Sequence, residues 1–165
     1  MPTIIKPSEL EFVENKAALT QFNWHTCLPR LGTLTNSKHL IFDIRSLDPG
    51  KYSYPYHYHN FSEELFVVFS GSATLRTQKG LQEIQQGEIV FFETGETGAH
   101  QLFNHTNIPC VYLDIRTFKD YDVTEYPDSN KINIAPNFGV FEKKDQVEYS
   151  KGEENIDEIW KTFKK

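Results

Sequence analysis

The sequence predicts an all-β protein in which short strands form a sandwich or a barrel. Stretches that are apolar, or that alternate apolar and polar residues, recur between residues 39 and 118, and turn residues separate them. Aromatic residues make up 14% of the chain, with 13 Phe and 8 Tyr, and this content favours packed β-structure over disorder. Such regular short intervals are typical of a sandwich or barrel rather than of βαβ units.

The predicted strands are separated by recognisable turns. Asp48-Pro49-Gly50 closes the first strand, because Pro sets φ and Gly permits a positive φ. Lys79-Gly80 has the character of a hairpin tip, and Gln86-Gly87 forms a further turn. The predicted strands cover residues 39–47, 52–59, 63–69, 72–77, 81–86, 88–94, 100–106 and 110–118.

The two ends of the chain differ from this β-rich region. Residues 11–19 are charged and predict a solvated edge or a short helix, and residues 126–141 surround one short strand with turn residues. Residues 155–163 predict a terminal helix, with Asn155 as N-cap and Glu158 as its capping-box partner. One face of this helix would carry Ile156, Ile159, Trp160 and Phe163. Such a stripe is suited to packing against the barrel or a second subunit.

Size and composition narrow the function classes. We expect one domain over residues 1–165, with a core barrel over about 39–117 and terminal extensions that pack on it or on a partner. The net charge of −6 argues against a nucleic-acid backbone as the main partner. Cys27 and Cys110 match no paired spacing and are expected to be reduced thiols, with a long-range disulfide as the alternative. Neither a signal sequence nor a membrane-spanning run is visible, so we expect a cytoplasmic protein without a membrane partner.

A pair of histidines marks the first candidate site. His57 and His59 stand two residues apart, and side chains i and i+2 of a strand point to the same face. Glu64 opens the next predicted strand and can return a carboxylate to the same point. Imidazole and carboxylate groups are suited to divalent first-row metals. The alternative is two half-buried structural histidines beside solvated carboxylates.

A second cluster, in residues 87–104, strengthens the metal-binding hypothesis, and with it the sequence resembles the cupin superfamily. The residues that supply the first cupin motif are Gly50, His57, His59, Glu64 and Gly71. Four residues separate the second histidine from the glutamate, and six separate the glutamate from the glycine. The spacer before the first histidine is one residue longer than usual.

The second cupin motif is present with departures. Gly87, His100 and Asn104 match it, but Glu93 replaces the usual proline and His100 lies two residues later than the pattern. The corner over residues 94–98 is therefore expanded, and either of its two glycines could take the turn position. The resemblance covers about residues 39–117.

The resemblance implies a double-stranded β-helix, the jelly-roll barrel of cupins, followed here by the short C-terminal helix. It also implies one divalent ion, without deciding among Fe, Mn, Ni, Co, Cu and Zn. The implied ligands are His57, His59, Glu64 and His100. Small cupins with a single barrel commonly pair, so we expect a homodimer.

Neighbouring groups have expected roles as well. An apolar wall beside the site is expected from Phe66, Val68, Phe91 and Phe92. Candidates to orient the histidine rings are Asn104 and the hydroxyls of Tyr52, Tyr54 and Thr106.

Cupins include dioxygenases, sugar isomerases and epimerases, decarboxylases and binding proteins, so the fold does not fix the function. Our first hypothesis is an oxygenase-type oxidoreductase, such as a dioxygenase, that acts on a small organic molecule. The second is a sugar or sugar-phosphate isomerase or epimerase, with Arg45, Arg76 and Arg116 as candidates to hold phosphate. The third is a protein that binds or senses a small molecule without catalysis.

Overall fold

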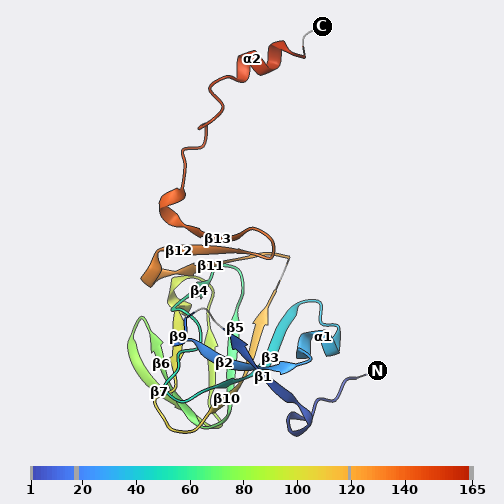
Figure 1. Ribbon diagram of the computed structural model, residues 1–165, viewed down its shortest axis with the longest axis vertical. Coiled ribbons are helices and arrows are strands. Elements are labelled where there is room, and N and C mark those ends of the chain that lie inside the picture. Colours follow the sequence, from blue (N-terminus) through green and yellow to red (C-terminus); the bar gives the residue numbers. More distant parts are fainter. Residues whose placement is uncertain (1, 17–18, 119, 164–165) are drawn as a thin grey trace.

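The computed structural model describes residues 2–16, 19–118 and 120–163, and short strands dominate it (Figure 1). The strands are β1 (Glu11–Lys16), β2 (Asn23–Leu28), β3 (Leu40–Leu47), β4 (Tyr58–His59), β5 (Glu64–Ser70), β6 (Ser72–Thr77), β7 (Gly80–Gln85), β8 (Ile89–Phe92), β9 (His100–Phe103), β10 (Cys110–Thr117), β11 (Asp122–Tyr126), β12 (Lys131–Ala135) and β13 (Gly139–Glu142). The two α-helices are α1 (Leu31–Thr35) and α2 (Ile156–Lys161). Four short 3-10 helices cover Pro7–Glu9, Glu96–Gly98, Pro127–Ser129 and Lys143–Asp145.

The strands form three antiparallel sheets. The largest has the order β1-β2-β3-β10-β5-β8, the second has the order β7-β6-β9, and the third has the order β13-β12-β11-β4. The main core draws on strands of the first two sheets, with Leu47, Phe66 and Tyr112 from one and Leu75 and Leu102 from the other. The predicted all-β barrel with a short C-terminal helix is therefore confirmed.

Buried and more exposed side chains alternate along β5, and the candidate ligand Glu64 lies on the buried side, inside the barrel. Glu64, Phe66 and Val68 are buried, whereas Phe69 on the other face is 38% exposed. Successive strand residues point to opposite faces, so the core contacts of Phe66 also direct the Glu64 carboxylate inward.

Two residues of the cupin-like motifs hold loops in place. Gly71 has φ +76°, and a Cβ atom there would lie 2.5 Å from the carbonyl oxygen of Pro109. No other residue type therefore fits this turn. The buried Asn104 side chain donates hydrogen bonds to the carbonyl oxygens of Leu47 and Ile108, both at 2.8 Å. It is not a partner of a candidate histidine.

Some strands were missed or were predicted too long. Residues 11–16 form β1 at the edge of the six-stranded sheet, which fits the predicted solvated edge and not the alternative of a short helix. Residues 17–18 of this prediction lie outside the described residues. β11 was not predicted at all. The expected strand 52–59 shortens to β4, with isolated bridges at Tyr52 and His57, since the intervening Pro55 lacks an N–H for pairing.

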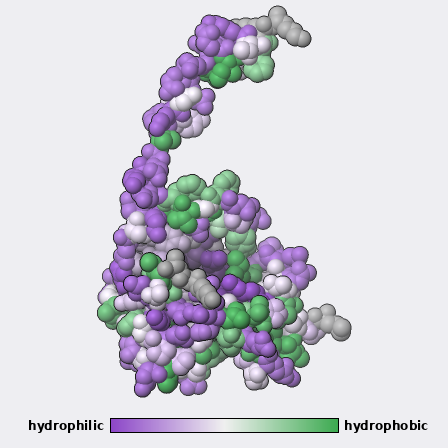
Figure 2. Space-filling view, in the orientation of Figure 1, coloured by the Kyte–Doolittle hydropathy of each residue, from purple (hydrophilic) through white to green (hydrophobic). Residues whose placement is uncertain are grey.

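The C-terminal segment leaves the barrel. After β13 the chain runs away from the sheets and ends in α2 (Figure 1). Asn155 is the N-cap as predicted, but its side chain makes no capping hydrogen bond. The apolar stripe of α2 is 43% exposed at Ile156 and 76% exposed at Phe163, and it is visible as a green patch in Figure 2. The stripe does not pack against the barrel, and its packing against a second copy stays a prediction.

Candidate metal centre

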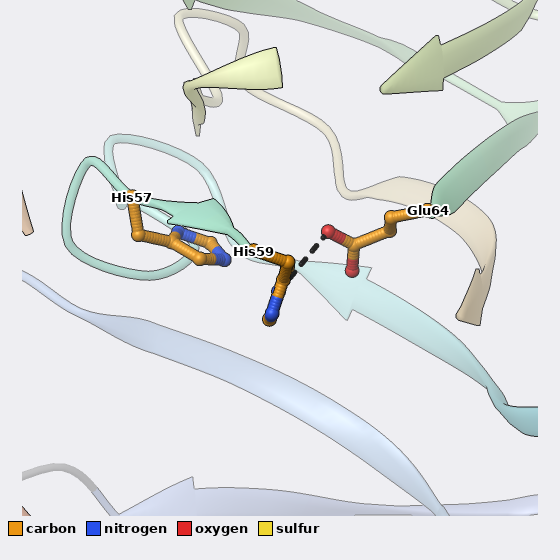
Figure 3. Close-up of side chains that lie close together, drawn as sticks. All are labelled: His57, His59 and Glu64. Atoms are coloured by element: carbon orange, nitrogen blue, oxygen red, sulfur yellow. Dashed lines mark ion pairs between the residues drawn. The ribbon is translucent and has the colours of Figure 1, made fainter. Parts of the chain in front are cut away.

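Three of the predicted ligands gather at one point inside the barrel. His57 lies just before β4, His59 ends β4, and Glu64 begins β5 (Figure 3). All three side chains are buried, and one possible ligand atom from each lies within 4.8 Å of the others. A buried group of this kind could bind a metal ion.

The fourth predicted ligand lies beside these three. His100 begins β9, and its backbone pairs with that of His57 through two hydrogen bonds of 2.9 and 3.2 Å. Its Nε2 atom is 3.1 Å from Oε2 of Glu64. The structure thus brings all four residues together, and their binding of a metal stays a prediction.

Two buried atoms in this group need a partner. Glu64 Oε2 and His100 Nε2 have no hydrogen-bond partner among the described residues, although they lie 3.1 Å apart. Buried polar atoms are almost always satisfied, because an unpaired one costs about 1–3 kcal/mol. A cation between the imidazole and the carboxylate would satisfy both atoms, so the residues present fit a metal ion.

Hydrogen bonds orient two of the histidine rings. Nδ1–H of His57 donates to the carbonyl oxygen of Pro55, and Nδ1–H of His100 donates to that of Gly98, both at 2.8 Å. A carbonyl oxygen can only accept, so each Nδ1 carries the proton and each Nε2 keeps its lone pair for a ligand bond. In both cases the acceptor lies two residues before the histidine.

His59 is held by side chains of β11. Its Nδ1 is hydrogen-bonded to the carboxylate of Asp122, and the Thr124 hydroxyl lies 3.2 Å away. Nη1 of Arg116 lies near both ring nitrogens of His59, 3.2 Å from Nε2 and 3.5 Å from Nδ1. The carboxylate fixes the tautomer in which Nε2 faces Glu64, at 3.6 Å.

The side chains expected to orient the histidines therefore do not do so. Backbone carbonyl groups and Asp122 take this role in place of Asn104 or a hydroxyl of Tyr52, Tyr54 or Thr106. Every residue has a backbone carbonyl group, so the sequence does not indicate which of them accepts a hydrogen bond from a histidine. Asp122 was missed because it belongs to a strand that the sequence did not reveal.

Burial sets the charge states of the centre. Burial lowers the pKa of His57 to about 3, and the nearby His100 acts in the same direction, so this ring is neutral at pH 7. Burial alone would raise the pKa of Glu64, but the surrounding histidines outweigh it and lower the pKa, so the carboxylate is ionised. Neutral imidazole and ionised carboxylate are the forms that bind metals.

A second acid lies beside this carboxylate. Burial raises the pKa of Asp114 on β10 to about 7, and the negative charge of Glu64 acts in the same direction. Nε of Arg45 lies 3.4 Å from Oδ2 of Asp114 and partly offsets this effect. Sequence analysis gave no role to Asp114.

Aromatic side chains form part of the wall. The ring of Phe92 stacks on His100 with centroids 3.7 Å apart, and Phe66 meets the same imidazole edge-on at 5.5 Å. Val68 is buried as predicted, but Phe91 is 54% exposed. Phe91 follows the opposite parity to Phe92 on β8, so its predicted place in the wall was wrong.

A cavity of about 280 Å³ opens beside His57, His59 and Glu64. Arg45 and Arg116 line it as the phosphate hypothesis required, and so does Arg30, which sequence analysis did not select. Arg76 lies outside the cavity lining, where its guanidinium group pairs with Asp128 at 2.6 and 2.8 Å. Trp24, Tyr54 and Tyr126 are among the other lining residues.

Both cysteines and two further histidines lie outside this group of candidate ligands. Cys27 and Cys110 are free, buried thiols, as expected. His25 lies 3.3 Å from Asp48, and His105 is exposed.

No helix within the described part of the chain has the length and apolar character needed to cross a membrane.

The barrel and its buried group of imidazole and carboxylate side chains define a small β-barrel protein in which a metal ion could be bound. Residues 44–116 match the model of the cupin domain, so this part of the chain is a cupin domain. No curated protein matches the sequence.

Several solved structures share the fold. One, from Acidithiobacillus ferrooxidans and provisionally named a sugar phosphate isomerase, has a TM-score of 0.77 at 24% identity and covers 88% of this chain and 95% of its own. A sugar phosphate isomerase of the cupin superfamily from Silicibacter pomeroyi has a TM-score of 0.75 at 20% identity. The match covers 90% of this chain and 98% of the other. The polyketide cyclase of Streptomyces resistomycificus has a TM-score of 0.57 at 17% identity, covering 72% and 81%. At these identities the likeness shows the fold.

Proposed function

We propose that this protein is a metal-dependent isomerase that interconverts the aldose and ketose forms of a small sugar or sugar phosphate. The observation that carries the proposal is a cavity whose lining includes three of the four candidate metal ligands, a further acid and three arginines. Two of the similar structures, with TM-scores of 0.77 and 0.75, bear the name sugar phosphate isomerase, which supports this hypothesis over the oxygenase hypothesis.

The candidate ligands give the cavity floor its chemistry. A divalent ion held by His57, His59, Glu64 and His100 would act as a Lewis acid toward the carbonyl and hydroxyl oxygens of a sugar. The rings of Phe66 and Phe92 pack against His100 and exclude water from one side. Ligand pockets typically begin at about 300 Å³, so a cavity of about 280 Å³ suits a small substrate.

Asp114 is placed to move the proton. Aldose–ketose interconversion takes a proton from the carbon beside the carbonyl group and returns one to the carbonyl carbon. The hydroxyl proton passes from one oxygen to the other, so there is no net oxidation. The Asp114 side chain lines the cavity next to Glu64, and Arg45 holds its carboxylate at 3.4 Å. A carboxylate fixed in this way can accept the proton and return it.

Direct observation of the reaction tests the proposal. The full chain, loaded in turn with Fe, Mn, Ni, Co, Cu or Zn, is incubated with aldoses, ketoses and their phosphate esters in heavy water and followed by NMR. We expect interconversion with deuterium entering at one carbon, and its loss in Asp114→Asn with the metal content unchanged. Absence of interconversion with every metal, or oxygen consumption by the loaded protein instead, would contradict the proposal.

A further inference from the structure

Arg30 differs from the other arginines of the cavity in having an exposed guanidinium group. It precedes helix α1, it lines the cavity, and its side chain is 52% exposed. Arg45 is 6% exposed and the candidate ligand Glu64 is equally buried. Arg30 therefore stands at the cavity rim, while the candidate metal ligands form its floor.

The charges around Arg30 leave it incompletely neutralised. Its Nη1 lies 3.4 Å from Oδ2 of Asp43, and Nη1 of Arg45 lies at the same distance from the same oxygen. The hydroxyl of Thr26 also donates a hydrogen bond to this oxygen. One carboxylate thus serves two guanidinium groups, and Asp43 is Arg30's only ion-pair partner within the described part of the chain.

The second guanidinium group of this pair has three polar partners. Arg45 donates a hydrogen bond of 2.7 Å to Thr26 and pairs with Asp114 at 3.4 Å, in addition to its contact with Asp43. It is buried among these partners and is suited to positioning them. Of the two arginines that share Asp43, Arg30 is the one whose exposed side chain a ligand can reach.

A third guanidinium group adds positive charge to the cavity. Nε of Arg116 is buried and has no hydrogen-bond partner among residues 2–16, 19–118 and 120–163. The lining residues include three arginines against the two acids Glu64 and Asp114, with Asp43 paired to two of these arginines, and a divalent ion would give the cavity an excess of positive charge. An anionic ligand is the chemistry that this balance favours.

We propose that Arg30 binds the phosphate group of a phosphorylated sugar at the cavity rim. The planar guanidinium group presents paired N–H donors that match phosphate oxygens, and the partial exposure of Arg30 allows a ligand to reach them. The placement of the sugar between rim and floor rests on the proposed function, whereas the phosphate contact itself does not. Arg30 lies outside residues 44–116, so a segment beyond the matched cupin domain sets substrate preference.

Phosphate binding without turnover tests this inference. The zinc-loaded full chain is titrated with inorganic phosphate by calorimetry, and the metal-free chain is titrated in parallel to separate direct binding to the metal. We expect phosphate affinity to fall about tenfold or more in Arg30→Gln, because a charge-assisted contact is lost. Arg76→Gln is the matched control, since Arg76 lies outside the cavity lining, and its affinity should stay within about twofold of the unaltered chain.

The outcomes separate this inference from the proposed isomerase. Absence of phosphate binding by the unaltered chain, or unchanged affinity in Arg30→Gln, overturns the role of Arg30 even if unphosphorylated sugars are isomerised. Weakened phosphate binding in Arg30→Gln without any interconversion supports Arg30 and overturns the isomerase. If Arg30→Gln fails to fold, Arg30→Lys decides: weaker binding supports the bidentate contact, and unchanged binding contradicts it.

Discussion

At the residue scale, each candidate histidine has one ring nitrogen bonded to an acceptor and the other directed at Glu64 or at the space beside it. For His59 the acceptor is the Asp122 carboxylate. Burial raises the pKa of Asp122, but the bond to His59 outweighs it and lowers the pKa, so the group is ionised and strengthens imidazole as a ligand. The arrangement makes Asp122 a positioning residue whose effect on metal binding is measurable.

We expect Asp122→Asn to weaken metal affinity by about 10- to 100-fold. The amide can still hold the ring, but it carries no negative charge to raise the basicity of Nε2. Competition with a chromogenic chelator for zinc measures the affinity. Asp128→Asn is the control, because Asp128 pairs with Arg76 away from the centre and should bind zinc as the unaltered chain does. Equal affinities for both variants would contradict the role of Asp122.

The raised pKa of Asp114 predicts that the free energy of unfolding depends on pH. Its pKa is raised from 3.8 to about 7 by burial and by Glu64. A carboxyl group of this kind contributes stability below its ordinary pKa, and that contribution is lost as pH rises to the folded-state value. In Asp114→Asn this loss is absent.

The stability of metal-free Asp114→Asn relative to the unaltered chain should therefore rise between pH 4 and pH 7 and level off above it. The slope is at most about 1.4 kcal/mol per pH unit. Urea unfolding at a series of pH values measures it. Asp128→Asn should show no such rise in this range, because contact with Arg76 lowers the pKa of Asp128. A flat difference for Asp114→Asn would refute the raised pKa.

At the element scale, the side chains of the barrel strands alternate between the core and the surface, with a period of two residues. In the three-stranded sheet, Leu102 on β9 is 0% exposed and belongs to the main core, whereas Leu81 on β7 is 74% exposed. The same substitution at the two sites isolates the contribution of burial.

Leu102→Ala should lower the free energy of unfolding by about 2–5 kcal/mol, since it removes apolar contacts and leaves a cavity. Leu81→Ala should change it by no more than about 0.5 kcal/mol. Chemical denaturation of both variants is the measurement. A comparable loss at both positions would mean that the assignment of the inner face is wrong.

The strands that carry this period are the ones that the sequence predicted well. β3, β5, β6 and β10 combine apolar alternation with turn residues such as Gly71, and these are local signals. β1 and β11 are rich in polar residues, and only their partners in the sheets make them strands. Local patterns cannot report such partners.

The same distinction applies to the site. His57 and His59 were predicted from strand parity, and Glu64 and His100 from the spacing of the two cupin-like motifs. Their partners were not, because carbonyl groups have no side-chain signature and Asp122 is 63 residues from His59. Arg30 likewise reaches the cavity only through tertiary packing.

At the scale of the whole molecule, an apolar surface remains on the outer face of β5 and β8. Phe69 and Phe91 are exposed there, and the pairs Leu65–Phe91 and Val67–Ile89 lie side by side in the sheet. A contiguous apolar patch on a soluble protein marks an interaction site. The patch is made of uncharged residues in a chain of net charge −6, so two copies can meet there without repulsion.

We propose that a second copy covers this face in a symmetric homodimer. In it, the outer face of β5 and β8 of one copy meets the same face of its partner. Light scattering should give twice the chain mass of 19.2 kDa. Ile89→Glu should give the single-chain mass, because it would bury a charge in the interface. Leu81→Glu, equally exposed but on β7, should remain dimeric, as should a chain lacking residues 147–165. A dimer that survives Ile89→Glu but is lost on removing those residues would assign the interface to the stripe of α2 instead.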